Sequence, residues 1–362
     1  MASAPTAIET DALIVGAGPA GLFQAFELGL LEVGCHLVDA LPHAGGQCIE
    51  LYPDKPIYDI PALQATTGRA LVARLLDQLA PFKPQLHLGQ EVSALQRQPD
   101  GRFLVETAAG TRFLVKAVVI AAGVGAFQPR RLRLDGIERF EGTQLLYRPS
   151  DDPAAFAGRR LLVLGGDEDA VDRAVRFAEP GADADAGAAA GTVVLVHRRD
   201  VFNAEPAQLA RLQALREAGR IRVVAGQPTG FDVEGAPGAE RLAALHLLAP
   251  DDSMQREPLD VLLVSQGLSP KLGPVADWGL AMERKQLVVD TASFATSEPG
   301  LFAVGDINTY RGKKKLIVSA FHEAALAAFG VADHLHPERK TPLQYTTTSP
   351  RLHQLLGVAR KD

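Results

Sequence analysis

The sequence predicts an α/β protein made of two Rossmann-like three-layer domains, the second inserted into the first. A glycine fingerprint follows an apolar strand at the start of the chain, and a similar unit begins near residue 161. A strand and a helix that suit the first domain return near the C-terminus. We therefore expect residues 1–127 and 270–362 to form one domain and residues 128–269 to form the inserted domain.

The first domain opens with a predicted β-α-β unit. Its parts are a buried strand at 12–15, the turn GAGPAG at 16–21, a helix over 22–31 and a strand at 35–38. Residues 41–61 are rich in glycine, proline and tyrosine, which predicts a long loop. Long loops inside compact domains are often functional.

The pattern then continues and repeats. The expected elements are a helix over 68–79, antiparallel strands around Val92, Phe103 and Phe113, an apolar run at 117–122, a linker FQPRRLRLDG, and strands at 161–164, 193–196, 261–264 and 301–304. Residues 179–191 are of low complexity and predict a flexible surface loop. A helix over 318–335 closes the pattern and completes the first domain.

Composition excludes several classes of protein. The chain has 362 residues, 47% of them apolar, and a net charge of −6, so it is neither disordered nor a typical nucleic-acid binder. No stretch approaches the ~18 apolar residues that a membrane helix needs. Two cysteines cannot build a disulfide framework and fit a reducing compartment. We expect a cytoplasmic protein.

The first fingerprint predicts a dinucleotide site. Gly16 makes the tight turn, Gly18 lets the backbone approach a pyrophosphate, and Gly21 lets helix and strand pack closely. The helix N-terminus then presents free amides to the phosphates. Asp39 ends the second strand, where an acid is expected to bind a ribose hydroxyl.

Several segments resemble one family, the ferredoxin (flavodoxin)–NADP reductases of the thioredoxin-reductase-like type. They are DALIVGAGPAGLF, GGQCIELYPDKPIYDIPA, VVIAAGVGAFQPR, LVHRRDVFNA, LGPVADWGL and LFAVGDINTYRGKKKLI. The resemblance extends from about residue 11 to the tail QYTTTSP and implies an FAD-binding first domain, an NAD(P)H-binding second domain and a homodimer.

The resemblance also implies roles for single residues in binding FAD. Gly16, Gly18 and Gly21 would hold the pyrophosphate and Asp39 the adenosine ribose. Stacking on the isoalloxazine would come from Tyr52 on one face and from Tyr345, in the C-terminal tail, on the other. The remaining implied contacts are Gln47 on the flavin side, the Val92 backbone at the adenine, Phe127 at the domain junction, Asp306 at the ribityl or phosphate oxygens, and Thr347 near flavin N5.

The second fingerprint departs from the expected GGGDSA. It reads Gly165-Gly166-Asp167-Glu168-Asp169-Ala170, so an acid stands where the pyrophosphate approaches the backbone. An acid at a helix N-terminus also caps the free amides and takes the place of the phosphate. NADPH binding that is weak, displaced or lost is one interpretation. The other is a turn that shifts slightly and still binds.

Two arginines favour retained NADPH binding. Arg198 and Arg199 directly follow the strand at 193–196, where cations would pair with the 2′-phosphate. Asn203 stands where the family usually has a further arginine, which removes one cation. Solvated surface arginines are the alternative interpretation.

The cysteines exclude dithiol chemistry, because no CxxC occurs and the position five residues after Cys48 is Pro53. A single-cysteine peroxidase role for Cys48 stays open, while Cys35 is expected to be a buried strand residue. The histidines show no metal-ligand spacing, so no metal is expected.

Basic residues gather in two places in this acidic chain. They are Arg130, Arg131 and Arg133 in the linker and Arg311, Lys313, Lys314 and Lys315 after GDI. If both groups border the flavin, they could steer an acidic ferredoxin or flavodoxin to it; solvated charge runs are the alternative.

The leading hypothesis is an FAD-dependent oxidoreductase that transfers electrons between NADPH and a one-electron carrier of the ferredoxin or flavodoxin type. Hydride would pass between nicotinamide and flavin, and the electrons would then leave singly. One alternative is an FAD-binding protein with weak or lost NADPH binding that acts in interaction or regulation. Another is an NADH oxidase or peroxidase that depends on Cys48.

Overall fold

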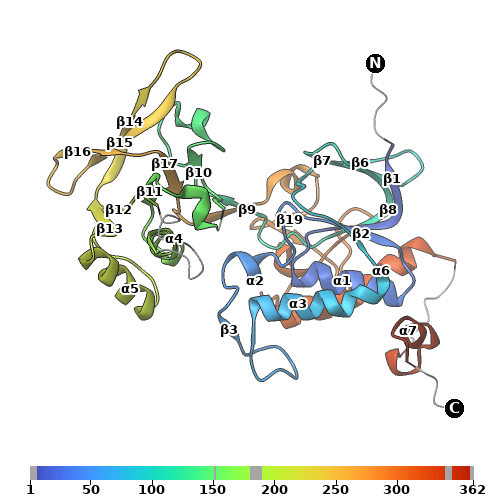
Figure 1. Cartoon of the computed structure of the whole chain (residues 1–362). Coiled ribbons are helices and arrows are strands. Elements are labelled where there is room, and N and C mark those ends of the chain that lie inside the picture. The colour runs from blue at the N-terminus through green and yellow to red at the C-terminus, as the bar shows by residue number, and fades with distance from the viewer. Residues whose placement is uncertain (1–5, 151, 180–189, 339–344, 359–362) are drawn as a thin grey trace. The chain divides into compact units, whose positions relative to one another are not determined.

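The computed structural model describes residues 6–150, 152–179, 190–338 and 345–358. Its backbone contacts divide the chain into two units, one of residues 1–127 and 270–362 and the other of residues 128–269 (Figure 1). Each unit contains parallel strands and helices, so the predicted α/β class is confirmed.

The first unit is built on a seven-stranded mixed sheet. Apolar side chains fill its central strands: Ala12, Leu13 and Ile14 are fully buried. In order across the sheet the strands are β5 (Gln85–His87), β2 (Cys35–Val38), β1 (Ile8–Val15), β8 (Arg112–Ile120), β7 (Phe103–Thr107) and β6 (Val92–Arg97), with β21 (Leu301–Ala303) also paired to β8. The pairs β2–β1, β1–β8 and β21–β8 are parallel, which brings the carboxyl ends of β1, β2 and β21 to one edge.

Three long helices pack in this unit: α1 (Pro19–Leu30), α3 (Gly68–Leu79) and α6 (Ile317–Leu335). α1 contacts both α3 and α6 (Figure 1). Gly29 permits close packing, since a Cβ there would lie 2.5 Å from the Phe82 ring. The smaller elements are α2 (Gln47–Glu50), α7 (Pro350–Leu355), the hairpin β3 (Pro56–Ile57) with β4 (Thr66–Thr67), and the sheet β19 (Met282–Glu283), β20 (Gln286–Val288) and β22 (Asn308–Thr309).

The second unit has a parallel sheet and an antiparallel one. The parallel strands lie in the order β10 (Leu145–Leu146), β17 (Val261–Val264), β11 (Arg160–Leu164), β12 (Thr192–His197) and β13 (Ile221–Ala225), with helices α4 (Glu168–Ala178) and α5 (Pro206–Glu217). The antiparallel sheet is β14 (Gln227–Glu234), β15 (Arg241–Leu248) and β16 (Met254–Pro258). Strands β9 (Ala126–Pro129) and β18 (Leu268–Lys271) pair with each other.

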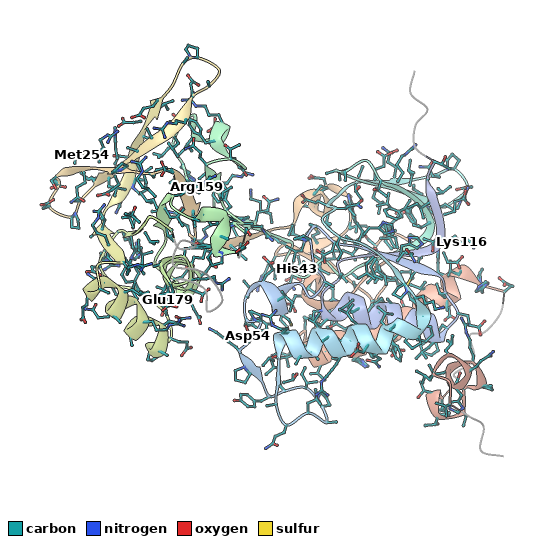
Figure 2. All side chains as sticks on the ribbon, in the orientation of Figure 1. His43, Asp54, Lys116, Arg159, Glu179 and Met254 are labelled. Atoms are coloured by element: carbon teal, nitrogen blue, oxygen red, sulfur yellow. The ribbon has the colours of Figure 1, made fainter. Side chains whose placement is uncertain are left out.

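The structure differs from the sequence expectations in two segments. The expected loop at 41–61 contains α2 and β3, and residues 206–258, for which only a domain was expected, form α5 and β13 to β16. Most of the expected surface loop at 179–191 lies outside the described residues. Figure 2 shows the side chains within each unit and labels exposed Met254 on β16 and Lys116, which pairs with Asp11 at 2.7 Å.

Candidate functional site

The turn between β1 and α1 cannot hold side chains at two of its glycines. Gly16 has a φ of +113°, and a Cβ on it would lie 2.4 Å from the carbonyl oxygen of Ala121. A Cβ on Gly21 would lie 1.9 Å from the carbonyl oxygen of Gly16. The close contact expected between helix and strand is therefore present in this turn.

The N-terminus of α1 has no side-chain cap. Its N-cap is Gly18, which offers no acceptor, and Pro19 at the first helical position has no amide hydrogen to satisfy. Gly46 approaches Gly18 from the following loop, where a Cβ on Gly46 would lie 3.1 Å from the Cα of Gly18. This helix end is free to bind an anion.

Asp39 lies at the carboxyl end of β2, beside this turn. Its Oδ2 accepts a hydrogen bond of 2.6 Å from the amide of Ala17, and its Oδ1 accepts one of 2.8 Å from the amide of Leu41. Burial raises the pKa of the Asp39 carboxyl, and these two amides oppose that shift. The two hydrogen bonds hold the carboxylate in one orientation at the strand end.

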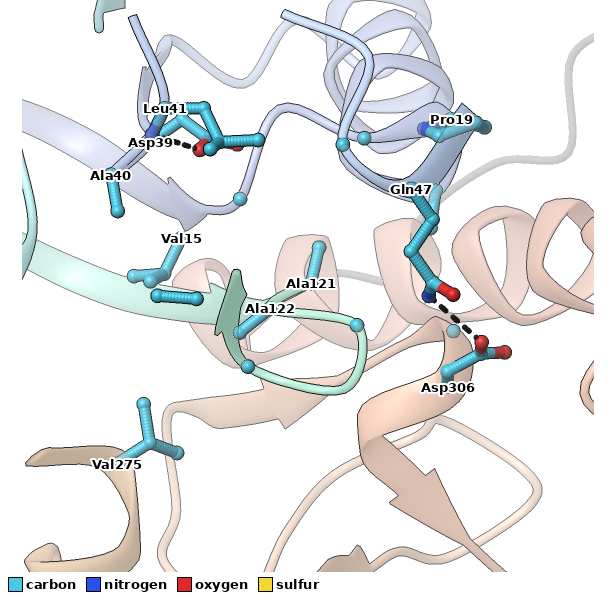
Figure 3. A pocket seen from close by; sticks show the side chains of 18 of the residues that line it. Val15, Pro19, Asp39, Ala40, Leu41, Gln47, Ala121, Ala122, Val275 and Asp306 are labelled. Atoms are coloured by element: carbon cyan, nitrogen blue, oxygen red, sulfur yellow. Dashed lines mark hydrogen bonds between the residues drawn. The ribbon is translucent and has the colours of Figure 1, made fainter. Parts of the chain in front are cut away.

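Gln47 and Asp306 meet at the other end of the site (Figure 3). The Nε2 of Gln47 donates a 3.0 Å hydrogen bond to the Oδ2 of Asp306, although 259 positions separate them in the chain. Tyr52 lies beside them, and its hydroxyl accepts a 3.6 Å contact from the Sγ of Cys48. Burial raises the pKa of both Tyr52 and Cys48.

These residues line one pocket in the first unit. Of the positions expected to bind FAD, those lining it are Gly16, Gly18, Asp39, Gln47, Tyr52, Val92 and Asp306. The uncapped end of α1 lies between Asp39 at one end and Asp306 at the other, as the pyrophosphate between adenosine and flavin requires. The donors and the shape of the pocket fit FAD.

The pocket also includes residues that the sequence did not indicate. Leu272, Pro274 and Val275 return from the C-terminal part of the chain to line it, and Lys315 lines it beside the start of α6. The sequence relates the segment LGPVADWGL to this site only through the family resemblance, because no local spacing connects it with the first fingerprint.

The C-terminal tail does not reach this pocket in the described structure. Tyr345 is 67% exposed, Thr347 is also exposed, and neither lines the pocket. The short helix α7 is tied elsewhere, because Arg351 pairs with Glu32 at 2.8 Å just beyond the C-terminal end of α1. The side chain of Phe127 lies outside the described part of the structure.

The second fingerprint joins β11 to α4. A Cβ on Gly165 would lie 1.9 Å from the backbone carbonyl oxygen of Ser265, so this position needs glycine. A Cβ on Gly166 would lie 2.5 Å from the ring of His197, which would have to move. Asp167 caps α4: its Oδ1 accepts a 3.1 Å hydrogen bond from the amide of Ala170. The predicted capping by this acid is therefore confirmed.

Burial raises the pKa of Asp167, and the nearby charge of Asp169 adds to that effect. Asp169 itself points to Arg173, with which it forms an exposed ion pair of 3.0 Å. Asp167 is thus the acid whose carboxylate occupies the helix end, where a phosphate would bind.

Arg198 and Arg199 follow β12 and are exposed. Among the described residues neither guanidinium has an ion-pair partner, so both can receive an anion. His197, which the sequence did not single out, lies against Gly166, and its Nδ1 is 2.9 Å from the carbonyl oxygen of Arg199. The ring of His197 therefore lies against the second glycine turn, and two exposed arginines follow it in the chain.

The structure corrects the expected basic docking groups at one position, Lys313. Lys313 is not available to a partner protein, because its side chain is only 7% exposed and is paired with Glu323. Lys315 lines the cofactor pocket, and Arg131 is paired with Glu141. The other six positions are exposed: Arg130, Arg131 and Arg133 lie in the second unit, and Arg311, Lys314 and Lys315 lie in the first.

Across the described residues, no group of three or more histidine, cysteine or acidic side chains could hold a metal ion. Over the same residues, no helix is long and apolar enough to cross a membrane. Cys35 and Cys48 are both free thiols.

Comparison with known proteins adds family relationships to this geometry. A family described as pyridine nucleotide-disulphide oxidoreductase matches residues 10–324. A ferredoxin–NADP reductase of Paracidovorax citrulli is 59% identical over 355 residues, which cover 97% of each chain. A ferredoxin–NADP reductase of Albidiferax ferrireducens is 57% identical over 351 residues, 97% of this chain and 96% of the relative.

The fold is also found among solved structures. The thioredoxin reductase of T. acidophilum superposes with a TM-score of 0.58, covering 90% of this chain and 98% of that one, at 22% sequence identity. At this identity the likeness shows the fold alone: two dinucleotide-binding domains within one chain.

Proposed function

This chain belongs to the pyridine nucleotide-disulphide oxidoreductase family and, within it, to the ferredoxin–NADP reductases, and on that premise we propose how its residues perform the reaction. It is an FAD-dependent oxidoreductase that transfers electrons between NADPH and ferredoxin. The pocket between Asp39 and Asp306, with the uncapped α1 end between them, is the observation that supports this function most directly.

When bound, FAD would supply the hydride and single-electron chemistry of this reaction. We propose that the amides at the start of α1 hold its pyrophosphate, that Asp39 accepts a hydrogen bond from the adenosine ribose, and that the backbone of Val92 meets the adenine. Gln47 and Asp306 would bind the ribityl end, and Tyr52 would shield one flavin face from water.

No cysteine pair takes part in this scheme. Cys35 and Cys48 are free thiols, and burial raises the pKa of each, that of Cys35 to about 12. A neutral thiol is a poor nucleophile. The dithiol step suggested by the family description therefore has no counterpart here, and electrons leave the flavin directly.

NADPH is the cosubstrate, and we propose that the second unit binds it with Arg198 and Arg199 at the 2′-phosphate and the Gly165–Gly166 turn at the pyrophosphate. Asp167 then opposes the pyrophosphate and lowers the affinity without abolishing it. The near full-length similarity to ferredoxin–NADP reductases favours this reading over a non-catalytic flavoprotein.

We propose that ferredoxin approaches the first unit near Arg311 and Lys314, in the loop before α6. Both side chains are exposed and, among the described residues, neither is in an ion pair. The start of α6 lines the flavin pocket, so these cations lie where a carrier must come to accept electrons.

Three further points belong to the proposal: the homodimer and the tail contacts rest on the family resemblance, and the cytoplasmic location rests on the composition. The protein would be a homodimer and would be cytoplasmic. Tyr345 and Thr347 would contact the flavin, which requires the tail to leave its position beside Glu32. Light scattering of the purified protein tests the first point, with an expected mass of twice 38.5 kDa.

An anaerobic titration tests the proposed function. NADPH is added to the oxidised holoenzyme while the flavin absorbance is followed, and ferredoxin is added afterwards. We expect bleaching by NADPH and recovery on adding oxidised ferredoxin. A yellow protein that NADPH does not bleach would instead support the non-catalytic alternative.

A further inference from the structure

A buried ion pair holds the turn that carries Asp306, and we propose that Lys313 and Glu323 are positioning residues for FAD: they fix the backbone of Gly305 so that the Asp306 carboxylate faces the pocket. The inference rests on the proposed FAD site and adds two residues that do not themselves line it.

Glu323 lies on α6 and is fully buried. Its Oε2 accepts hydrogen bonds from the amide of Gly305 at 2.7 Å and from the Nδ2 of Asn308 at 2.8 Å. Its Oε1 accepts one from the hydroxyl of Tyr310 at 3.0 Å and another from the Nζ of Lys313. Four donors, all from one short segment, therefore converge on one carboxylate.

Lys313 completes the arrangement from the opposite side. Its Nζ donates to Glu323 and also donates a 2.9 Å hydrogen bond to the carbonyl oxygen of Gly305. The amide of Gly305 is bound by the carboxylate and its carbonyl by the ammonium, so both backbone polar atoms of this residue are held by one ion pair. That carbonyl belongs to the peptide bond that leads into Asp306.

The turn also depends on a glycine at position 305. Gly305 has a φ of +79°, and a Cβ on it would lie 3.1 Å from the Cβ of Ala20. The Nε2 of Gln286 also donates to the carbonyl oxygen of Asp306 at 3.0 Å. The Asp306 side chain is left to meet Gln47 at the pocket.

The burial of the Lys313–Glu323 ion pair requires its hydrogen-bond partners to stay in place. A buried ion is stable only with well-placed partners, and removing one partner leaves the other uncompensated. Loss of the Lys313 ammonium therefore leaves the Glu323 carboxylate with neutral donors alone and releases the carbonyl of Gly305. Because these contacts converge on the turn, the displacement should reach Asp306 first.

A double-mutant cycle on the holoenzyme tests this. Wild type, Lys313→Met, Asp306→Ala and the double variant are diluted, and FAD release is followed by the rise in flavin fluorescence to obtain the dissociation constant. We expect each single change to weaken FAD binding at least about tenfold, and the double variant to bind no more weakly than Asp306→Ala alone. That non-additivity is the signature of a residue that acts through Asp306.

Two variants accompany the cycle. Lys314→Met removes the neighbouring, exposed lysine and should leave FAD affinity unchanged. Tyr310→Phe removes one donor to Glu323 with little change of shape and should weaken FAD binding a few fold; it replaces Lys313→Met in the cycle if that variant does not fold. Binding of NADP⁺ to each variant reports whether the second unit is intact.

Additive losses in the cycle would overturn the inference, because they would mean that Lys313 only supports the domain as a whole. An unchanged affinity in Lys313→Met would overturn it equally. A wild-type protein that holds no FAD would contradict the proposed function itself, which separates that failure from these two.

Discussion

Asp167 is the residue at which this chain departs furthest from a usual dinucleotide turn. Its carboxylate caps α4 through the amide of Ala170, at the helix end where a phosphate would otherwise bind. A cosubstrate that binds there must displace the cap or approach a negative charge. We therefore propose that this residue limits how tightly NADPH is held.

We expect Asp167→Asn to tighten NADP⁺ binding about tenfold, since asparagine caps a helix as well as aspartate does and carries no charge. Asp169→Asn is the matched control: it removes the same charge from the same helical turn, but that carboxylate is paired with Arg173. Calorimetric titration of the oxidised enzyme measures both. Equal tightening in the two variants would show a general charge effect instead.

Cys48 lines the flavin pocket, and its buried thiol contacts Tyr52. Because burial raises its pKa, the sulfur stays protonated near neutral pH and is a weak nucleophile. We expect Cys48→Ser to retain NADPH-driven ferredoxin reduction and full FAD content, measured by rate and absorbance. Loss of NADPH oxidation with FAD still bound would favour the oxidase or peroxidase alternative.

The elements around the glycine turns can be predicted from the sequence, because each strand, turn and helix follow one another directly in the chain. Gly16, Gly21 and Asp39 lie where their spacing indicates. The prediction that Lys313 is exposed is wrong because its partner is not adjacent in sequence. Lys313 belongs to a basic run, and only the packing of α6 brings Glu323 to it. Leu272 and Val275 also line the pocket, but they lie far from the first fingerprint in sequence, so local spacing does not predict them.

In the second unit, an ion pair joins the start of β11 to the residue before β17. Arg160 and Asp260 lie 2.6 Å apart, and the arginine lowers the pKa of Asp260 to about 2. A carboxyl with a lowered folded pKa adds stability above its ordinary pKa of 3.8, and loses that contribution as the pH falls toward 2.

We therefore expect Asp260→Asn to lower the free energy of unfolding at pH 7 by about 1 kcal/mol, the upper end for a partly exposed pair. The difference from wild type should vanish near pH 2. Urea unfolding at the two pH values measures it, with Asp200→Asn as a control in the separate, more exposed pair that Asp200 forms with Arg216. A loss that persists at pH 2 would mean that packing, not charge, is responsible.

The whole molecule carries a net charge of −6, which repels an acidic carrier, and we propose that Arg311 and Lys314 attract it locally. Salt screens both effects, with a Debye length of about 8 Å at physiological ionic strength. If local attraction dominates, the KM for ferredoxin should rise as salt is added. We expect that rise in the wild type.

Lys314→Glu should raise the KM at low salt several fold and remove much of its salt dependence, with FAD content unchanged. Lys83→Glu makes the same charge change at the other end of α3. The start of this helix, at Gly68, lies against Cys48 beside the pocket, whereas Lys83 follows its C-terminal end. Steady-state kinetics over a range of salt compares the two variants. Equal effects would exclude local docking at Lys314.

The N-termini of α1 and α4 differ in a way that fits a tightly bound cofactor at the first and an exchanging cosubstrate at the second. Helix α1 begins at Gly18 without a side-chain cap, so its end is completed only when an anion binds. Helix α4 already carries its own anion in Asp167 and is complete when empty. Release of a bound nucleotide therefore leaves unpaired amides at the first turn but not at the second. This difference suits an enzyme that keeps one nucleotide through every turnover and releases the other each time.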